Sequence, residues 1–498
     1  MYQKLQLTAA LLFLMLFSTI AFGQKRYEFT PNVRDAYEKV FSLRFDEAAN
    51  ILSLEKKIDP DNITIYFVED YLDFFRVFIN EDFAEFERLL PNKDKRLSII
   101  KSGDRSSPYY LYMQAEVKLH WALLRLKFEQ NFQAALEIRK AFKHLESNEA
   151  KFPDFIATKK SLGVLHALIE TIPDKYRKLA KFVGVTGTIE QGIGELNEVM
   201  LYARKNDFIF EEETLVMYAF LMLHVGNQTE EAWSVLRNGN LDTRNNPLAC
   251  FAMANMQMQI GRNDEAIVTL QNRPVGSQYH PFHYLDYMLG LAKLYRMDKD
   301  ADVYLKRYVN NFKGQNYIKE AYQKLAWYEL LFNSESSYKN QMANCRQYGE
   351  AISDEDKKAY KEAIYGPVPN KTLLKARLFF DGGYYDKAEK VLSVKTVSDF
   401  TNNREKIEYY YRFGRIYHKM NHKADAKKYY DLTIELGKDQ PYYFACNAAL
   451  QMGILKESAG EYDLALDYFD QCLSMRPDEY KNSLHGKAKA GKNRVKGK

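Results

Sequence analysis

The feature that most constrains this chain is a pattern of small residues, aromatic residues and proline that returns at a nearly constant spacing toward the C-terminus. Three successive segments carry it: Gly383 and Ala388 in the first, Gly414 and Ala426 in the second, and Gly453, Gly460, Ala465 and Pro477 in the third. A period of about 20–50 residues is typical of one local unit that is stacked many times. The pattern therefore predicts a repeat architecture.

The spacing within each segment predicts a hairpin of two helices. Small residues in both halves let the two helices approach closely, and a glycine between them allows a tight turn. The proline at the end of the third segment stops the second helix. A single hairpin leaves one face apolar and must stack on a neighbour. Only 13 Pro and 24 Gly occur in 498 residues, which favours long helices over many short strands.

This pattern resembles the tetratricopeptide repeat, a helix–turn–helix unit of about 34 residues. The same phase continues upstream at Ala48, Pro60, Ala232, Gly261 and Ala266. The chain is similar to exported tetratricopeptide proteins of Bacteroidetes-type bacteria. Its glycine-rich stretch 184–194 also resembles a eukaryotic outer-membrane-associated tetratricopeptide family. The resemblance implies an all-α fold, an α-solenoid of about 20 helices wound as a right-handed superhelix, with a divergent helical N-terminal region.

We expect six parts along the chain. They are a signal peptide (1–23), a divergent helical region (24–210), a middle array of hairpins (211–352), a linker or hinge (353–370), a C-terminal array (371–480) and a basic disordered tail (481–498). The linker is expected because a charged stretch there ends in Gly366-Pro367-Val368-Pro369.

The N-terminus has the pattern of an export signal. Lys4 precedes an uncharged apolar stretch over residues 5–17, and Ala21-Phe22-Gly23 places small residues before Gln24. We expect cleavage before Gln24 and residence in the periplasm or at the periplasmic face of the outer membrane. The alternative is an uncleaved membrane anchor, because the uncharged stretch is just long enough to span a bilayer.

The charge of the chain is concentrated in its tail. The net charge is +5, but residues 24–480 carry 63 basic against 66 acidic side chains. This balance does not suit nucleic acid, so we expect no nucleic-acid partner. The tail has seven cations and no acid. It is interpreted as a solvated end, with attraction to an anionic membrane surface as the alternative.

The sequence contains no motif that predicts catalysis, a cofactor or a metal. Neither the phosphate-binding G-x-x-x-x-G-K-[ST] motif nor H-E-x-x-H occurs, and the four cysteines form no C-x-x-C. The pairs His280/His283 and His418/His422 lack further ligands nearby. Cys446 and Cys472 could meet at adjacent ends of one hairpin, either as a disulfide or as two buried thiols.

The remaining candidates are residues at the repeat positions that face the concave side of such arrays. They are Tyr284, Tyr287, Tyr295, Tyr411, Arg415, His418 and Lys419. Aromatic faces beside cations suit an extended peptide, whereas the alternative for each residue is a place in the core. We therefore expect a non-enzymatic scaffold that binds a protein or peptide partner. The alternative is an outer-membrane-associated glycan- or nutrient-binding protein, and an enzyme is least favoured.

Overall fold

The computed structural model describes residues 25–170, 172, 181–182, 184–226 and 228–497. Within these ranges the chain forms 24 α-helices and one 3-10 helix, and no strand. The predicted all-α solenoid is confirmed, with somewhat more helices than expected. The signal segment predicted over 1–23 lies outside the described residues. The described residues divide into two compact units, those up to residue 76 with 84–162, and residues 77–83 with those from 163 onward.

The first unit is built from helical pairs. Its helices are α2 (Pro31–Phe41), α3 (Phe45–Ile58), most of α4 (Thr64–Asn80), α5 (Phe83–Ile100), α6 (Tyr109–Lys127), α7 (Asn131–Lys151) and the first part of α8 (Ala157–Ile169). The pairs α2/α3 and α6/α7 pack along their lengths. Ala48 is fully buried on α3, and this helix ends two residues before Pro60.

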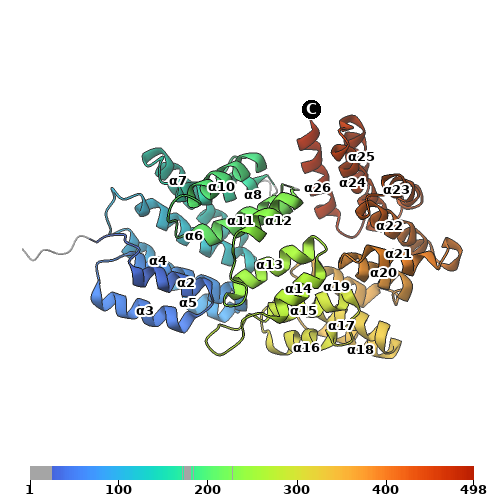
Figure 1. Cartoon of the computed structure of the whole chain (residues 1–498), viewed down its shortest axis with the longest axis horizontal. Coiled ribbons are helices and arrows are strands. Elements are labelled where there is room, and N and C mark those ends of the chain that lie inside the picture. Colours follow the sequence, from blue (N-terminus) through green and yellow to red (C-terminus); the bar gives the residue numbers. More distant parts are fainter. Residues whose placement is uncertain (1–24, 171, 173–180, 183, 227, 498) are drawn as a thin grey trace, which may run out of the picture. The chain divides into compact units, whose positions relative to one another are not determined.

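The second unit continues with hairpins in chain order (Figure 1). Its helices up to the expected linker are α10 (Ile189–Ala203), α11 (Glu211–His224), α12 (Thr229–Asn238), α13 (Pro247–Gln259), α14 (Asn263–Gln271), α15 (Tyr284–Arg296), α16 (Ala301–Asn311), α17 (Ile318–Phe332) and α18 (Glu335–Gln347). After the linker come α19 (Asp354–Tyr365), α20 (Lys371–Asp381), α21 (Tyr385–Ser393), α22 (Asn403–Lys419), α23 (Lys423–Gly437), α24 (Tyr443–Ser458), α25 (Tyr462–Ser474) and α26 (Lys481–Val495).

The repeat residues lie where two helices touch. A Cβ atom on Gly414 would come within 2.7 Å of the Tyr430 ring, and one on Gly453 would overlap the ring of Phe469. These two glycines therefore admit an aromatic ring of the second helix. The alanines on the second helices are fully buried: Ala232, Ala266, Ala388, Ala426 and Ala465. Gly261, Gly383 and Gly460 take positive φ angles at the turns, a conformation that favours glycine.

The prediction of a linker over 353–370 is wrong for most of that range, because residues 354–365 form α19. Ser353 caps this helix by accepting a hydrogen bond from the Asp356 backbone N–H. The buried Asp356 carboxylate accepts bonds from the backbone N–H groups of Tyr317 and Glu320 at the start of α17. This acidic stretch is thus a structural contact between α19 and α17, and residues 366–370 form an extended connection to α20.

The prediction of a disordered tail is wrong as well, because residues 481–495 form α26. Leu484, Ala488, Gly491 and Val495 are buried against α24 and α25, and a Cβ atom on Gly491 would overlap the Phe469 ring. The lysines lie between these apolar positions. The helix covers the end of the last hairpin, as a capping element does in a repeat array.

The first helices of successive hairpins contact one another. Such contacts join α13 to α15, α15 to α17, α20 to α22, α22 to α24 and α24 to α26, and α15 also contacts α20. No contact of that extent joins the second helices of successive hairpins in the described parts of the chain. A stack whose first helices converge is curved toward them, so these helices form the inner face of the second unit.

The glycine-rich stretch is a close approach between helices. A Cβ atom on Gly192, in α10, would meet the Gly163 carbonyl oxygen of α8, and one on Gly187 would overlap His166. The Thr188 side chain caps α10. Gly187 and Gly192 are therefore explained by close packing between α8 and the segment that leads into α10, whereas Gly184 and Gly194 have open space around them.

Candidate partner-binding surface

Two of the predicted groove tyrosines are core residues. Tyr287 is 3% exposed, and its ring centroid lies 5.3 Å from that of Tyr308 and 5.6 Å from that of Tyr317. Its hydroxyl donates to Glu320 at 2.7 Å. For Tyr287 the structure favours the alternative of a place in the core, because the ring joins α15 to α16 and α17.

Tyr411 is buried in the same way at the contact between α22 and α24. It is 1% exposed and packs on Tyr443 and Phe444 at centroid distances of 5.7 and 5.2 Å. Its hydroxyl accepts hydrogen bonds from Arg415 Nη1 at 2.8 Å and Asn447 Nδ2 at 2.7 Å. Tyr411 therefore holds Arg415 in place, and a direct contact with a partner stays a prediction.

The other predicted residues lie nearer to solvent. Tyr284, Tyr295 and His418 are half-buried, and Lys419 is exposed. Burial raises the pKa of both Tyr284 and Tyr295 well above its usual value. His418 Nδ1 lies 3.2 Å from the Tyr430 hydroxyl, and burial followed by the charge of Arg415 lowers the pKa of His418 to about 4. His418 is therefore neutral near pH 7.

A pocket of about 180 Å³ opens on the same face, between α19, α20, α22 and α24. Its wall includes Trp327, Lys358, Arg377, Arg412 and Tyr443. Arg412 is neutralised there, since its Nε and Nη2 donate to Glu408 at 3.1 and 2.6 Å. The acid Glu362 already accepts hydrogen bonds from Gln323 and from Trp327 Nε1.

Five cations along this face have no tight carboxylate partner among the described residues, and we call them the basic strip. They are Lys358 on α19, Arg377 on α20, Arg415 and Lys419 on α22, and Lys487 on α26. Only Arg377 has an acid within ion-pair range, with Asp381 at 3.6 Å. In contrast, Arg494 on α26 forms two hydrogen bonds with Glu457, at 2.7 and 2.9 Å.

Aromatic rings position three members of the basic strip. The Arg377 guanidinium lies 4.6 Å from the Trp327 ring centroid, and the Arg415 guanidinium lies 4.7 Å from that of Phe380. Lys358 Nζ lies 4.8 Å from the centroid of Tyr480. A ring face attracts a cation without cancelling its charge. These groups are thus oriented and still available to an anion.

The pKa values reflect this crowding of like charges. Burial and the charges of Arg377 and Lys324 lower the pKa of Lys358 to about 7. Partial loss of hydration and the charge of Arg415 lower the pKa of both Lys419 and Lys487. An anion bound to the strip would relieve this repulsion.

Three of these five cations were missed by the sequence reasoning, for separate reasons. Arg377 follows Ala376 as Arg415 follows Gly414, so the two arginines share one repeat position. That position could have identified Arg377. Lys358 and Lys487 lie in segments that the sequence assigned to a linker and a disordered tail, where no facing position can be derived.

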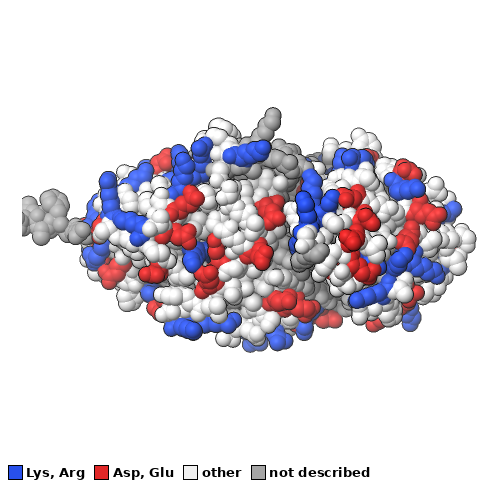
Figure 2. Space-filling view, turned by 90° about the horizontal axis from the view of Figure 1, so that it is seen from above, with Lys and Arg blue, Asp and Glu red and all other residues white. Residues whose placement is uncertain are grey.

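The described residues contain no group of three or more His, Cys, Asp or Glu side chains that could hold a metal ion. None of the helices that the structure describes is long and apolar enough to cross a membrane. On the face shown in Figure 2, cations and acids are interspersed, as the near balance of charge over residues 24–480 would produce.

The fold and this inner face define a helical repeat protein. A family model described as tetratricopeptide repeat matches residues 407–437 and 447–479, which fall on α22/α23 and α24/α25. The chain therefore carries tetratricopeptide repeats in its C-terminal part. No curated protein matches it.

Two solved structures are examples of those with a likeness to this chain. A monomeric mutant of IFIT1 with Gppp-AAAA is 12% identical with a TM-score of 0.29, and the match covers 85% of this chain and 99% of that chain. The Cut9–Hcn1 heterotetramer of the APC/C is 10% identical with a TM-score of 0.26, and the match covers 91% of this chain and 95% of the other.

Proposed function

We propose that this chain is a non-enzymatic scaffold that binds a protein or peptide partner on the inner face of its second unit. The observation that carries the proposal is the basic strip, in which three of the five cations lie over aromatic rings. Interfaces depend on a few such anchors, with arginine and tyrosine prominent among them. The half-buried Tyr295 lies on the same layer of helices and adds an aromatic surface.

We also propose that the protein is exported and acts in the periplasm or at the periplasmic face of the outer membrane. Support comes from the small residues at Ala21 and Gly23 after an uncharged apolar stretch. A peripheral contact of α26 with anionic headgroups belongs to the same proposal. It would involve its exposed lysines, because Lys492 and Arg494 are already paired with Asp470 and Glu457.

Site-specific photocrosslinking tests the proposed surface. A crosslinking amino acid is placed at Tyr295 on the inner layer, or at Lys390 on the exposed face of α21 as the matched control. The full chain is then incubated with envelope extract and its adducts are identified by mass spectrometry. We expect one recurring protein adduct from position 295 and not from position 390. Adducts from position 390 alone, or binding on a glycan array without any protein adduct, would refute the proposal.

A further inference from the structure

We infer that the basic strip binds an acidic peptide segment, whose Asp or Glu carboxylates pair with Arg377, Arg415 and Lys358. This inference rests on the proposed function and adds the chemistry of the partner. Arginine presents a planar fork that can bind a carboxylate through two hydrogen bonds, whereas lysine offers a point charge.

The first argument is the availability of these charges. Arg415 donates one hydrogen bond to a neutral hydroxyl, that of Tyr411, and forms no ion pair with any described residue. Arg377 has only Asp381 at 3.6 Å, beyond hydrogen-bond distance. By contrast, Arg412 and Arg494 each form a close ion pair with a glutamate. The strip therefore brings together several oriented cations that lack close counter-charges.

The second argument is that the strip is continuous. Arg377 acts electrostatically on Lys358, and Asp381 lies near enough to act on both Arg377 and Arg415. Arg415 in turn acts on Lys419 and Lys487. The helices that carry them are linked by direct packing of α20 on α22, α22 on α24 and α24 on α26. One extended ligand can thus reach successive members.

The third argument favours a peptide over a nucleic acid. Acidic side chains are interspersed with the cations, notably Glu320 and Glu362 beside Lys358 and Asp381 between the two arginines. A phosphate backbone carries one charge at every nucleotide and would meet these acids repeatedly. A peptide can place its carboxylates at selected residues and neutral side chains opposite the acids. Residues 24–480 also carry fewer basic than acidic groups.

Fluorescence anisotropy with the full chain tests the inference. The probe is a short labelled peptide of alternating Glu and Ser, compared with the same peptide carrying Gln in place of Glu. We expect the Glu peptide alone to bind, more weakly as salt is added. Arg377→Gln and Arg415→Gln should each weaken binding about tenfold or more, which corresponds to about 1.4 kcal/mol. Arg244→Gln, at an exposed turn, makes the same change of charge and should leave the affinity unchanged.

Three outcomes would overturn the inference: equal binding of the Gln peptide, no effect of either strip variant, or tighter binding of an RNA oligonucleotide of equal charge. A melting curve for each variant separates lost affinity from lost folding, and Arg415→Lys, which keeps the charge, should fold and bind with intermediate affinity. Failure here leaves the proposed function standing if position 295 still crosslinks to a partner. Failure of both experiments removes the inner face as a binding surface.

Discussion

The pKa of Lys358 depends on burial and on the charged groups that surround its side chain. Its ammonium group faces Arg377 on α20, Lys324 and Glu320 on α17, Glu362 on its own helix and the Tyr480 ring before α26. Burial and the two cations lower its pKa to about 7, from 10.5. Over the range between these values the unfolded chain holds a proton at Lys358 that the folded chain has released.

This difference predicts a pH dependence of stability. The contribution of Lys358 makes the free energy of unfolding rise as the pH increases from about 7 toward 10, because the unfolded state binds more protons. Lys358→Met should remove that part of the rise and should stabilise the chain most below about pH 7. Urea unfolding across this range measures it. Lys390→Met on exposed α21 is the control, and an identical pH profile for the two variants would contradict the prediction.

Substitutions of Tyr411 test whether this side chain belongs to the core or to the groove. Tyr411→Ala should lower the free energy of unfolding by about 3–5 kcal/mol, as expected when a buried aromatic ring is removed. Tyr411→Phe keeps the ring but leaves Arg415 and Asn447 without their acceptor, and should cost about 1–2 kcal/mol. Tyr365→Phe, at a side chain that is 78% exposed, should change little. An unchanged melting temperature for Tyr411→Ala would place the ring outside the core.

Among the helices, hairpins could be predicted from the sequence where small and aromatic residues keep their spacing. The turn at Gly460 and the fully buried Ala465 follow directly from that spacing. The helices α19 and α26 could not be predicted from it, because they carry no repeat signature and their charge dominates their composition. Their folding depends on tertiary contacts, such as Asp356 with the start of α17 and Gly491 with Phe469.

The absence of a repeat signature in α19 and α26 also explains why only part of the candidate surface could be predicted. Arg415 and Lys419 were found because their repeat positions face inward, whereas Lys358 and Lys487 reach the strip through the two helices that the sequence did not reveal. The sequence also did not predict which inward-facing residues are buried. The position of Tyr287 on its helix is inward-facing, but only the neighbouring rings of Tyr308 and Tyr317 show that the side chain is covered.

The approach of α24 to α25 predicts a clear response to a larger side chain. Gly453→Leu places atoms where the Phe469 ring lies, and overpacking of this kind costs about 1–3 kcal/mol. Gly486→Ala on α26 has open space around it and should be neutral or stabilising, because alanine favours a helix over glycine. Thermal unfolding followed by circular dichroism compares the two. Equal melting temperatures would show that the hairpin tolerates the extra volume.

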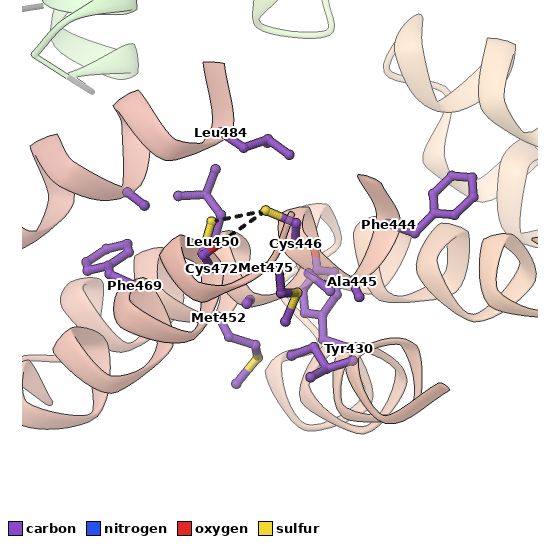
Figure 3. Close-up of a cluster of buried hydrophobic side chains, with 14 of the residues drawn as sticks. Tyr430, Phe444, Ala445, Cys446, Leu450, Met452, Phe469, Cys472, Met475 and Leu484 are labelled. Atoms are coloured by element: carbon purple, nitrogen blue, oxygen red, sulfur yellow. Dashed lines mark hydrogen bonds between the residues drawn. The ribbon is translucent and has the colours of Figure 1, made fainter. Parts of the chain in front are cut away.

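The two thiols of this hairpin form a second test at the same scale. Cys446 and Cys472 are buried with their sulfur atoms 3.5 Å apart, and Figure 3 shows them facing each other among Leu450, Met475 and Leu484. A diamide-type oxidant should therefore convert them to a disulfide, with the two hydrogens passing to the oxidant. The loop would stabilise the chain by about 3–4 kcal/mol.

Peptide mapping without reductant should reveal this link, with the mass of two hydrogens lost. Cys446→Ser should abolish both the link and the rise in melting temperature, whereas Cys250→Ser should leave them intact. A link that instead joins Cys250 or Cys345 to another thiol would contradict the geometry of the hairpin.

At the scale of the whole chain, the distribution of charge differs from the net value. The net charge of +5 comes from the tail, but two of the tail cations form ion pairs with acids of the last repeat. The positive charge on which the proposed recognition depends is instead local, in the basic strip of the inner face. A bulk measure such as the isoelectric point therefore does not predict this local charge.

Export is the last prediction, and it concerns the chain as a whole. If the uncharged stretch after Lys4 is a signal, the mature protein begins at Gln24 and is recovered outside the cytoplasm. Ala21→Lys places a long charged side chain where the cleavage site needs a small one, so the variant should accumulate as the longer precursor at the membrane. Gln24→Ser lies just beyond the site and should be processed normally. N-terminal sequencing and fractionation measure both, and a normal chain that begins at Met1 in the cytosol would refute the prediction.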